Sequence, residues 1–216
     1  MIGDLRREVC ELHGELPRNG LVAWTSGNLS ARVPGEDLMV IKASGAPYDE
    51  LTAEAIVVCD LDGDLVEGTL SPSSDAATHG HIYRAMPDVG GVAHTHSRYA
   101  TAWAIHGEPI PCAMTAMADE FGGAIPVGPF ALIGDEAIGR GVVETLAGHR
   151  SPAVLMRAHG VFTIGADARG AIKAAVMCED AAHTVYLARA LGAVPPLDPE
   201  DVDALHRRYQ DVYGQR

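Results

Sequence analysis

The stretch Gly91-Val92-Ala93-His94-Thr95-His96 lies near the middle of the 216-residue chain and is largely apolar before its two histidines. This composition predicts a buried β-strand. Side chains alternate along a strand, so His94 and His96 project from one face, about 7 Å apart at the backbone. Two imidazoles at that spacing can bind one metal ion. On this pattern alone, a pair of hydrogen-bonded core histidines is an equally good interpretation.

Further β-rich runs flank this central stretch on both sides. Before it, residues 28–33, 38–42, 56–60 and 65–67 are separated by Gly, Pro and Asp, which predicts an antiparallel meander. After it, apolar runs predict strands over 153–157 and 161–164, and a short strand over 113–115.

Apolar residues at helical spacing predict helices between these strands. The helices are expected over 2–16, 74–86, 101–105, 135–147, 168–191 and 199–209, with a loop over 117–123. Meandering strands with inserted helices predict a three-layer α/β/α sandwich around one mixed, largely antiparallel sheet. No stretch resembles a linker, so we expect one domain over residues 1–216.

Charge and hydropathy exclude several classes of partner. The chain has 16 Lys and Arg against 29 Asp and Glu, a net charge of −13 that repels nucleic acid and anionic membranes. No apolar run approaches the roughly 20 residues that span a bilayer, and the first ten residues lack a secretory signal. We therefore expect a soluble, cytoplasmic protein. The four cysteines form no C-x-x-C pair, which argues against a zinc ribbon and a dithiol redox motif.

His159 is a third candidate metal ligand, because it follows an apolar run and precedes Gly160. Three neutral imidazoles leave an open position on a metal ion, as in catalytic zinc sites. Taken alone, His159 is better explained by a structural role. Asp75 is a candidate carboxylate ligand, although an Asp at a helix start commonly complements the helix dipole. His79 and His81 cannot converge on one ion, since a helix sets them about 200° apart.

Three short polar stretches are candidate anion-binding sites. They are Thr25-Ser26-Gly27-Asn28, Ser44-Gly45, and Ser73-Ser74 at a predicted helix start. Hydroxyls, an amide and free backbone N–H groups bind phosphate without many cations, which suits an acidic protein. Each stretch alone is typical of an ordinary turn or cap. Together they predict a site for a small phosphate ester, provided that the fold brings them to one place.

These motifs together resemble the class II aldolase/adducin family over nearly the whole chain. The resemblance rests on residues 25–30, 41–45, 71–79 and 94–97, and on His159-Gly160. Within the family the chain is more similar to sugar-phosphate 4-epimerases than to ketose 1-phosphate aldolases. Asp75 stands where those aldolases typically have Glu, Ala118-Asp119 precedes residues 123–126, and the chain ends with Tyr213-Gly214-Gln215 before Arg216.

The resemblance implies a metal and a phosphate site. It implies one Zn²⁺ or another divalent ion per subunit, held by His94, His96 and His159, with Asp75 at or near the metal. It implies that phosphate is held by residues from the three polar stretches: Asn28, Ser44, Gly45, Ser73 and Ser74, with Thr25 or Ser26 close by.

The resemblance also implies that catalysis involves a neighbouring subunit. In the epimerases, an aspartate matching Asp119 and a C-terminal tyrosine from a neighbouring subunit, matching Tyr213, form the acid/base pair. Thr115 matches a further active-site position. The family is typically a cyclic homotetramer with sites at subunit interfaces. Met117 departs from the pattern, because the epimerases usually carry His two residues before that aspartate.

The activity that the resemblance implies is carbon–carbon bond chemistry on a small phosphorylated ketose. A C4 proton is not acidic enough for direct epimerisation, so breaking and rejoining the C3–C4 bond is required, with a metal as the electrophile. Neither lysine, Lys42 or Lys173, lies in a stretch that suggests a desolvated nucleophile. The alternatives are cleavage of a ketose 1-phosphate, decarboxylation of a phosphorylated sugar acid, and a non-catalytic adducin-like interaction module.

Overall fold

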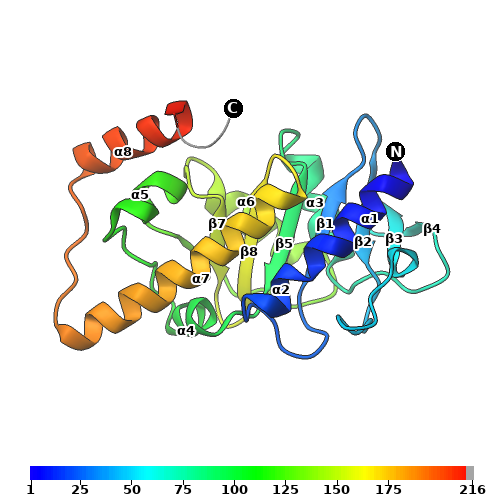
Figure 1. Ribbon diagram of the computed structural model, residues 1–216, viewed down its shortest axis with the longest axis horizontal. Coiled ribbons are helices and arrows are strands. Elements are labelled where there is room, and N and C mark those ends of the chain that lie inside the picture. Colours follow the sequence, from blue (N-terminus) through cyan, green and yellow to red (C-terminus); the bar gives the residue numbers. More distant parts are fainter. Residues whose placement is uncertain (213–216) are drawn as a thin grey trace.

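A computed structural model describes residues 1–212 of the chain and contains one eight-stranded sheet in that part (Figure 1). The strands run in the order β4-β3-β2-β1-β5-β8-β7-β6. Their bounds are β1 Asn28–Arg32, β2 Leu38–Lys42, β3 Ile56–Asp60, β4 Leu65–Glu67, β5 Gly91–Thr95, β6 Val127–Gly128, β7 Ala153–Met156 and β8 Gly160–Gly165. Only β6 and β7 are parallel among these pairs, so the described sheet is mixed and largely antiparallel, as expected.

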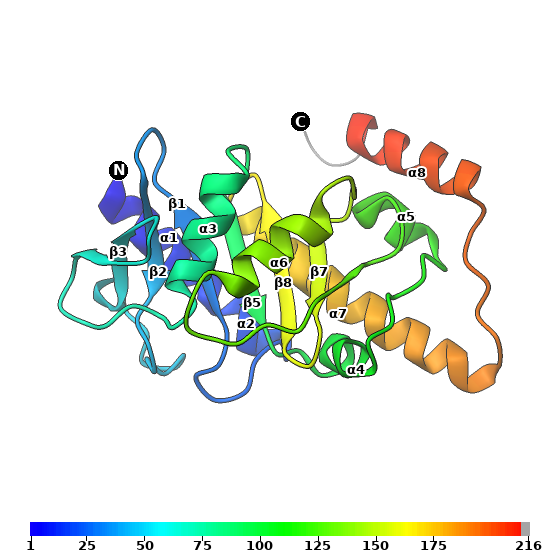
Figure 2. The ribbon, with the colours of Figure 1, turned by 180° about the vertical axis from the view of Figure 1, so that it is seen from behind.

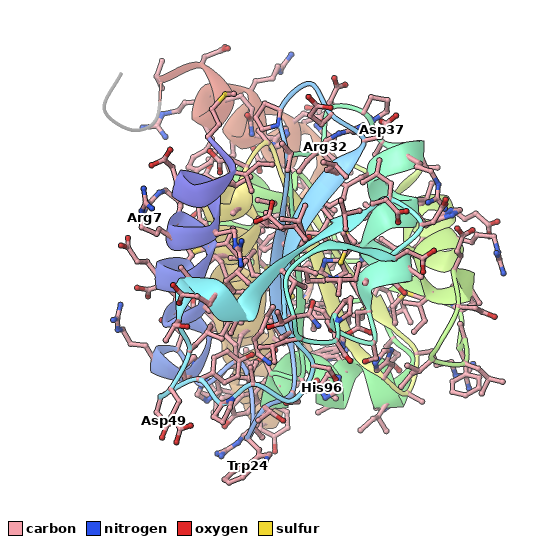
Figure 3. All side chains as sticks on the ribbon, turned by 90° about the vertical axis from the view of Figure 1, so that its right-hand side faces the viewer. Arg7, Trp24, Arg32, Asp37, Asp49 and His96 are labelled. Carbon is pink, nitrogen blue, oxygen red and sulfur yellow. The ribbon has the colours of Figure 1, made fainter. Side chains whose placement is uncertain are left out.

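Helices cover both faces of the sheet. Their bounds are α1 Ile2–His13, α2 Glu15–Arg18, η1 Ala53–Ala55, α3 Ala76–Ala85, α4 Arg98–His106, α5 Thr115–Phe121, α6 Ala137–Leu146, α7 Ala168–Leu191 and α8 Pro199–Val212. The reverse view shows α3 and α6 in front of the sheet and α7 behind it (Figure 2). The edge-on view separates α1 on one side of the strands from α3 on the other (Figure 3). The expected three-layer sandwich is confirmed.

Alternation along the strands builds a separate core on each face. In β2, Met39 and Ile41 pack in the cluster that contains residues of α3 and α6, whereas Val40 packs in the cluster that contains residues of α1 and α7. In β5, Val92 and Ala93 divide between the same two clusters. The period of two therefore explains why near-continuous apolar runs form strands that are buried on both faces.

The prediction for residues 113–123 is wrong. The chain there forms helix α5 instead of a short strand and a loop, and Gly122 ends the helix with φ of 58°. Met117, Ala118 and Phe121 are buried on one side of α5, which packs against α8 and α7. So short an apolar segment takes its conformation from tertiary packing, and its local pattern does not distinguish helix from strand.

Two further differences concern element boundaries. Helix α4 begins at Arg98, earlier than expected, because the Glu179 carboxylate of α7 accepts the backbone N–H groups of Tyr99 and Ala100, both at 2.9 Å. Strand β6 was not expected, because its two residues are too few to show an alternating pattern of apolar and polar side chains. Among the described residues, no helix combines the length and apolar character needed to cross a bilayer.

Candidate functional site

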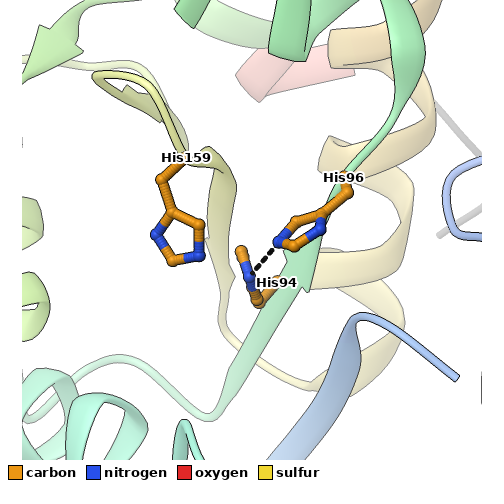
Figure 4. A group of neighbouring side chains, drawn as sticks. All are labelled: His94, His96 and His159. Atoms are coloured by element: carbon orange, nitrogen blue, oxygen red, sulfur yellow. Dashed lines mark hydrogen bonds between the residues drawn. The ribbon is translucent and has the colours of Figure 1, made fainter. Parts of the chain in front are cut away.

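Three histidines from two neighbouring strands meet at one point (Figure 4). His94 lies in β5, His96 directly after it, and His159 in the turn between β7 and β8. The antiparallel pairing of β5 with β8 brings this turn beside the end of β5. One ring nitrogen of each histidine lies within 4.8 Å of the others, and the Nε2 atoms of His94 and His96 are 2.9 Å apart.

The protein fixes the orientation of His94. Its Nδ1–H donates a hydrogen bond of 3.0 Å to the carbonyl oxygen of Val161, which leaves the Nε2 lone pair directed at the other two rings. The Phe162 ring stacks on the His94 ring at 4.2 Å between centroids, with 12° between planes. A histidine metal ligand is typically held by a hydrogen bond through its other nitrogen in this way.

The three imidazoles are held in the neutral form that binds metals. Burial lowers the pKa of His94 to about 3, and it also lowers the pKa of His96 and His159. The buried Nδ1 of His159 has no hydrogen-bond partner among the described residues. Three neutral nitrogen donors around one point fit a divalent transition-metal ion.

Asp75 supplies a carboxylate beside this cluster. It is the N-cap residue of α3, yet its side chain makes no capping hydrogen bond; its Oδ2 accepts the Asn28 amide N–H at 2.7 Å. Burial alone raises the pKa of Asp75, but its contacts with the neighbouring His94 and His79 and the Asn28 hydrogen bond outweigh this effect, and the pKa is lowered. The carboxylate is therefore directed into the pocket, which a role limited to the helix dipole does not explain.

The histidine cluster and the three polar stretches line one cavity of about 320 Å³. Its lining includes every residue in which the sequence predicted phosphate or metal binding: Thr25, Ser26, Gly27, Asn28, Ser44, Gly45, Ser73, Ser74, Asp75, His94, His96 and His159. Asn28 also joins two stretches directly, because its Nδ2 donates a second hydrogen bond of 3.0 Å to Ser73 Oγ. The condition set by the sequence, that the fold brings these stretches together, is met.

Sequence reasoning missed two residues of this cavity, Lys42 and Ile133. Contrary to expectation, Lys42 is desolvated: it is buried, and burial lowers its pKa. Its Nζ lies 3.3 Å from the carbonyl oxygen of Ala43. The sequence did contain a signal for Lys42, because a lysine at the end of an apolar strand faces either solvent or a polar pocket. Ile133 comes from the loop before α6 and carries no recognisable motif.

The expected acid/base residues do not line this cavity within one chain. Thr115 and Asp119 lie on α5, away from the cavity lining, and Thr115 is exposed. Asp119 Oδ1 is buried without a hydrogen-bond partner among residues 1–212. Met117, the residue that departs from the family pattern, is a buried core residue of α5. Tyr213 lies outside the described residues.

Comparisons with known proteins agree with the site and the fold. A family model described as Class II Aldolase and Adducin N-terminal domain matches residues 7–186. The L-ribulose-5-phosphate 4-epimerase UlaF of Salmonella paratyphi B (strain ATCC BAA-1250 / SPB7) is 39% identical over 220 residues, covering 97% of this chain and 95% of that protein. The protein of the same name from Salmonella typhi gives the same identity and coverage.

Solved structures give the same result for the fold. An L-fuculose 1-phosphate aldolase superposes with a TM-score of 0.89 at 28% identity, covering 96% of each chain. The l-fuculose-1-phosphate aldolase of Thermus thermophilus has a TM-score of 0.74 at 25% identity, covering 90% of this chain and 100% of that one. With the sequence match, the sheet and the histidine cluster in agreement, the chain belongs to the class II aldolase and adducin N-terminal domain family.

Proposed function

We propose that the protein is a zinc-dependent sugar-phosphate enzyme that breaks and re-forms a carbon–carbon bond, and that its reaction is 4-epimerisation of L-ribulose 5-phosphate. The observation that carries this proposal is the shared cavity: three neutral imidazoles and an ionised carboxylate face the same 320 Å³ space as the polar stretches. The 39% identity to named epimerases over nearly the full chain supports the choice of substrate.

The polar stretches hold the substrate's phosphate. The hydroxyls of Ser44, Ser73 and Ser74 and the backbone N–H of Gly45 are candidate donors in the cavity lining. Lys42 adds a cationic ammonium group there, which offsets part of the phosphate charge in a protein of net charge −13. Binding the phosphate through these groups fixes the distance from the phosphate to the histidines and hence which carbons reach them.

The histidines and Asp75 would hold the metal. Bound there, a zinc ion would supply Lewis-acid stabilisation for the substrate's C2 carbonyl and for the negative charge that develops as the C3–C4 bond breaks. His94 is kept in the required tautomer by Val161, and Asn28 holds the carboxylate of Asp75 at the same place. This arrangement needs no Schiff-base lysine.

Inversion at C4 needs proton transfer at the C4 oxygen from both faces of the aldehyde that forms. Two acid/base groups on opposite sides of the substrate meet this need. We assign these roles to Asp119 and Tyr213 of a neighbouring copy, with Thr115 as a further active-site residue, in a cyclic tetramer. The location of Thr115 and Asp119 on α5, outside their own chain's cavity, supports a contribution to another copy's site.

Aldol cleavage of a ketose 1-phosphate is the second candidate, because the TM-score of 0.89 relates the fold to an L-fuculose 1-phosphate aldolase. An interaction module without catalysis is disfavoured, since the three histidines converge and face a polar cavity.

One assay separates these possibilities. Purified protein with added zinc is incubated with L-ribulose 5-phosphate and, separately, with L-fuculose 1-phosphate. The proposal predicts D-xylulose 5-phosphate from the first substrate with no release of free cleavage products. Accumulation of dihydroxyacetone phosphate from the second substrate, without epimerisation of the first, would instead establish the aldolase. Undiminished turnover after thorough chelation would contradict both.

A further inference from the structure

A polar cluster outside the cavity joins three helices. Lys173 of α7 places its Nζ 2.7 Å from Glu120 Oε2 of α5, and the hydroxyl of Tyr209 of α8 donates to the same carboxylate oxygen at 3.0 Å. The Lys173 Nζ also lies 5.0 Å from the centroid of the Tyr209 ring. The Glu120 side chain is only 8% exposed, so its charge depends on these two partners.

Two more contacts bind α8 to the same region. The Nδ1–H of His206 donates to the backbone carbonyl oxygen of Asp119 at 3.0 Å, and Asp203 receives the guanidinium of Arg150 at 2.7 Å. Figures 1 and 2 both show α8 lying along α5 and far from the N-terminal strands. Outside this cluster, α8 has little buried surface, and Val202 is its one buried residue among 199–212.

The cluster touches both segments that carry the proposed acid/base residues. Glu120 follows Asp119 directly, and successive helix residues differ by about 100°, so anchoring Glu120 sets the direction of Asp119. Helix α8 is described as far as Val212, and Tyr213 follows it in the sequence. One ammonium group on the long helix α7 therefore fixes α5 and α8 relative to each other.

The ion pair does more than join two exposed side chains, because it keeps a buried carboxylate paired where three helices meet. A half-exposed lysine contributes little to stability through an ion pair, whereas a carboxylate buried beside it is costly unless it remains paired. Although burial alone lowers the pKa of Lys173, its hydrogen bonds to Glu120 and Tyr209 outweigh it, and the pKa is raised. The lysine is thus kept cationic at the place where α5, α7 and α8 meet.

We infer that Lys173 is a positioning residue, which acts through Glu120 and Tyr209 to hold α5 against α8 and so to align Asp119 for proton transfer in a neighbouring copy's cavity. This inference rests on the proposed function. It extends that function by assigning a role in turnover to a residue that contacts neither the substrate nor the metal.

The test compares Lys173→Met with Lys173→Arg and with the control Arg6→Met. Arg6 forms a comparable ion pair with Glu67, 2.8 Å long, at the far end of the sheet. Lys173→Met should lower kcat for epimerisation by about tenfold or more, because misplaced catalytic groups cost rate steeply. KM and zinc content should remain within about twofold of wild type, since the cavity is untouched. Lys173→Arg should restore most of the turnover, and the control should match wild type.

Mixed oligomers test whether the effect acts between copies. Lys173→Met chains have an intact cavity, and His94→Ala chains have an intact α5 and α8. Co-refolding the two variants should give more activity than either alone, because a cavity of the first is completed by a neighbour of the second. No gain on mixing would contradict the inference.

Hydrogen exchange gives a readout that does not depend on activity. Lys173→Met should speed amide exchange in residues 115–121 and 199–212 and leave strands β1 and β5 unchanged. Tyr209→Phe, a milder change, should show the same pattern should Lys173→Met fail to fold. An inactive wild type would overturn the proposed function. An active wild type with normal kcat in Lys173→Met, or unchanged exchange in both variants, would overturn the inference alone.

Discussion

Several functional side chains of the cavity are oriented by a second residue that itself does no chemistry. The Val161 carbonyl fixes the tautomer of His94, and Asn28 holds Asp75 and Ser73 with the two N–H groups of its amide. Such supporting contacts hold the site in place before the substrate binds, so less ordering is needed at the moment of reaction. Substitutions at these supporting positions should therefore affect metal binding or turnover without abolishing the fold.

The metal assignment predicts the behaviour of His94→Ala. The variant should lose bound zinc and all measurable turnover, because two imidazoles remain where three are needed. His159→Ala, which removes a half-buried ring, should give the same result with less risk to folding. Elemental analysis and circular dichroism measure metal content and fold. His149→Ala, at an exposed position, is the control and should retain zinc. Full zinc content in His94→Ala would refute the assignment.

His13 predicts a pH dependence of stability. Its Nδ1–H donates to Val9 O at 2.7 Å, its Nε2 accepts the Leu29 N–H at 3.1 Å, and burial lowers its pKa from 6.5 to about 4. Between pH 6.5 and 4, His13 becomes protonated in the unfolded chain but stays neutral in the folded protein. The free energy of unfolding should thus fall, as pH decreases from 6.5 to 4, by up to about 1.4 kcal/mol per pH unit from this residue.

Urea denaturation at several pH values tests this dependence in the wild type and in His13→Gln, whose amide cannot titrate. The variant should be less stable at pH 7 yet lose stability more slowly on acidification. All other histidines are common to both proteins, so the difference between the two slopes isolates His13. Parallel curves would show that His13 does not resist protonation.

Some residues of the site can be predicted from the sequence, and others cannot, depending on whether a motif, a family resemblance or only a single residue points to them. The spacing of His94 and His96 gave a metal pair only together with the strand. His159 was a candidate from its place before Gly160, and only the resemblance to a family favoured a metal role over a structural one. Lys42 was missed because a single lysine at a strand end has two equally ordinary environments, and the choice depends on loops distant in sequence. In our proposal Asp119 acts in another chain's cavity, and such a position cannot be located from one chain's geometry.

At the scale of elements, the contact between α3 and the turn after β3 sets where Asp75 lies. Gly80 of α3 packs so closely on Leu61 that an added Cβ would overlap the Leu61 carbonyl oxygen. The Arg84 guanidinium of the same helix donates to that oxygen. The helix can therefore approach the sheet only with glycine at position 80.

Gly80→Ala tests this close approach. Alanine normally favours a helix over glycine, but here the overlap should destabilise the protein by about 1–3 kcal/mol. Turnover should fall as well, because α3 carries Asp75 at its start. Gly3→Ala in α1 is the control: its Cβ would meet only the Arg7 side chain, at 3.8 Å, and stability should be unchanged or slightly higher. Urea midpoints measure both effects. Equal midpoints for Gly80→Ala and wild type would contradict the contact.

Long elements are easier to predict from the sequence than short ones. Helix α7 has the expected bounds, 168–191, because 24 residues give a sustained pattern. Helix α5 was missed, since its seven residues fold as they do through packing against α8 and α7. The meander of β1 to β4 was correct in order and direction, as short turns between strands leave few alternatives.

At the scale of the whole molecule, the central position of β1 and β5 in the sheet brings the residues of the site together. Asn28 pairs with His94 across these strands, and β8 on the other side of β5 brings the turn that carries His159. Segments more than a hundred residues apart in sequence thus meet at one end of the sheet. The proposed acid/base residues are the exception, and in our proposal the assembly of several chains supplies them.

Mixing two inactive variants tests that assembly. Asp119→Asn should lose epimerisation more than aldol cleavage, because cleavage can proceed with one acid/base group. Mixed with His94→Ala, it should recover about a quarter of the wild-type activity, since random assembly places complementary chains around that share of cavities. Light scattering should show a tetramer in each sample. If the mixed chains form tetramers but recover no activity, each site must be formed by one chain alone.

The turn between β7 and β8 has three residues, since Met156 pairs with Gly160 across the hairpin. Its middle residue, Ala158, is left-handed with φ of 55°. Because the turn is so short, inserting or deleting one residue would move the imidazole of His159 away from those of His94 and His96, while both strands remained intact. Efforts to redesign the protein for a new sugar should therefore keep the length of this hairpin and vary the residues around Ile133, which borders the cavity from the loop before α6.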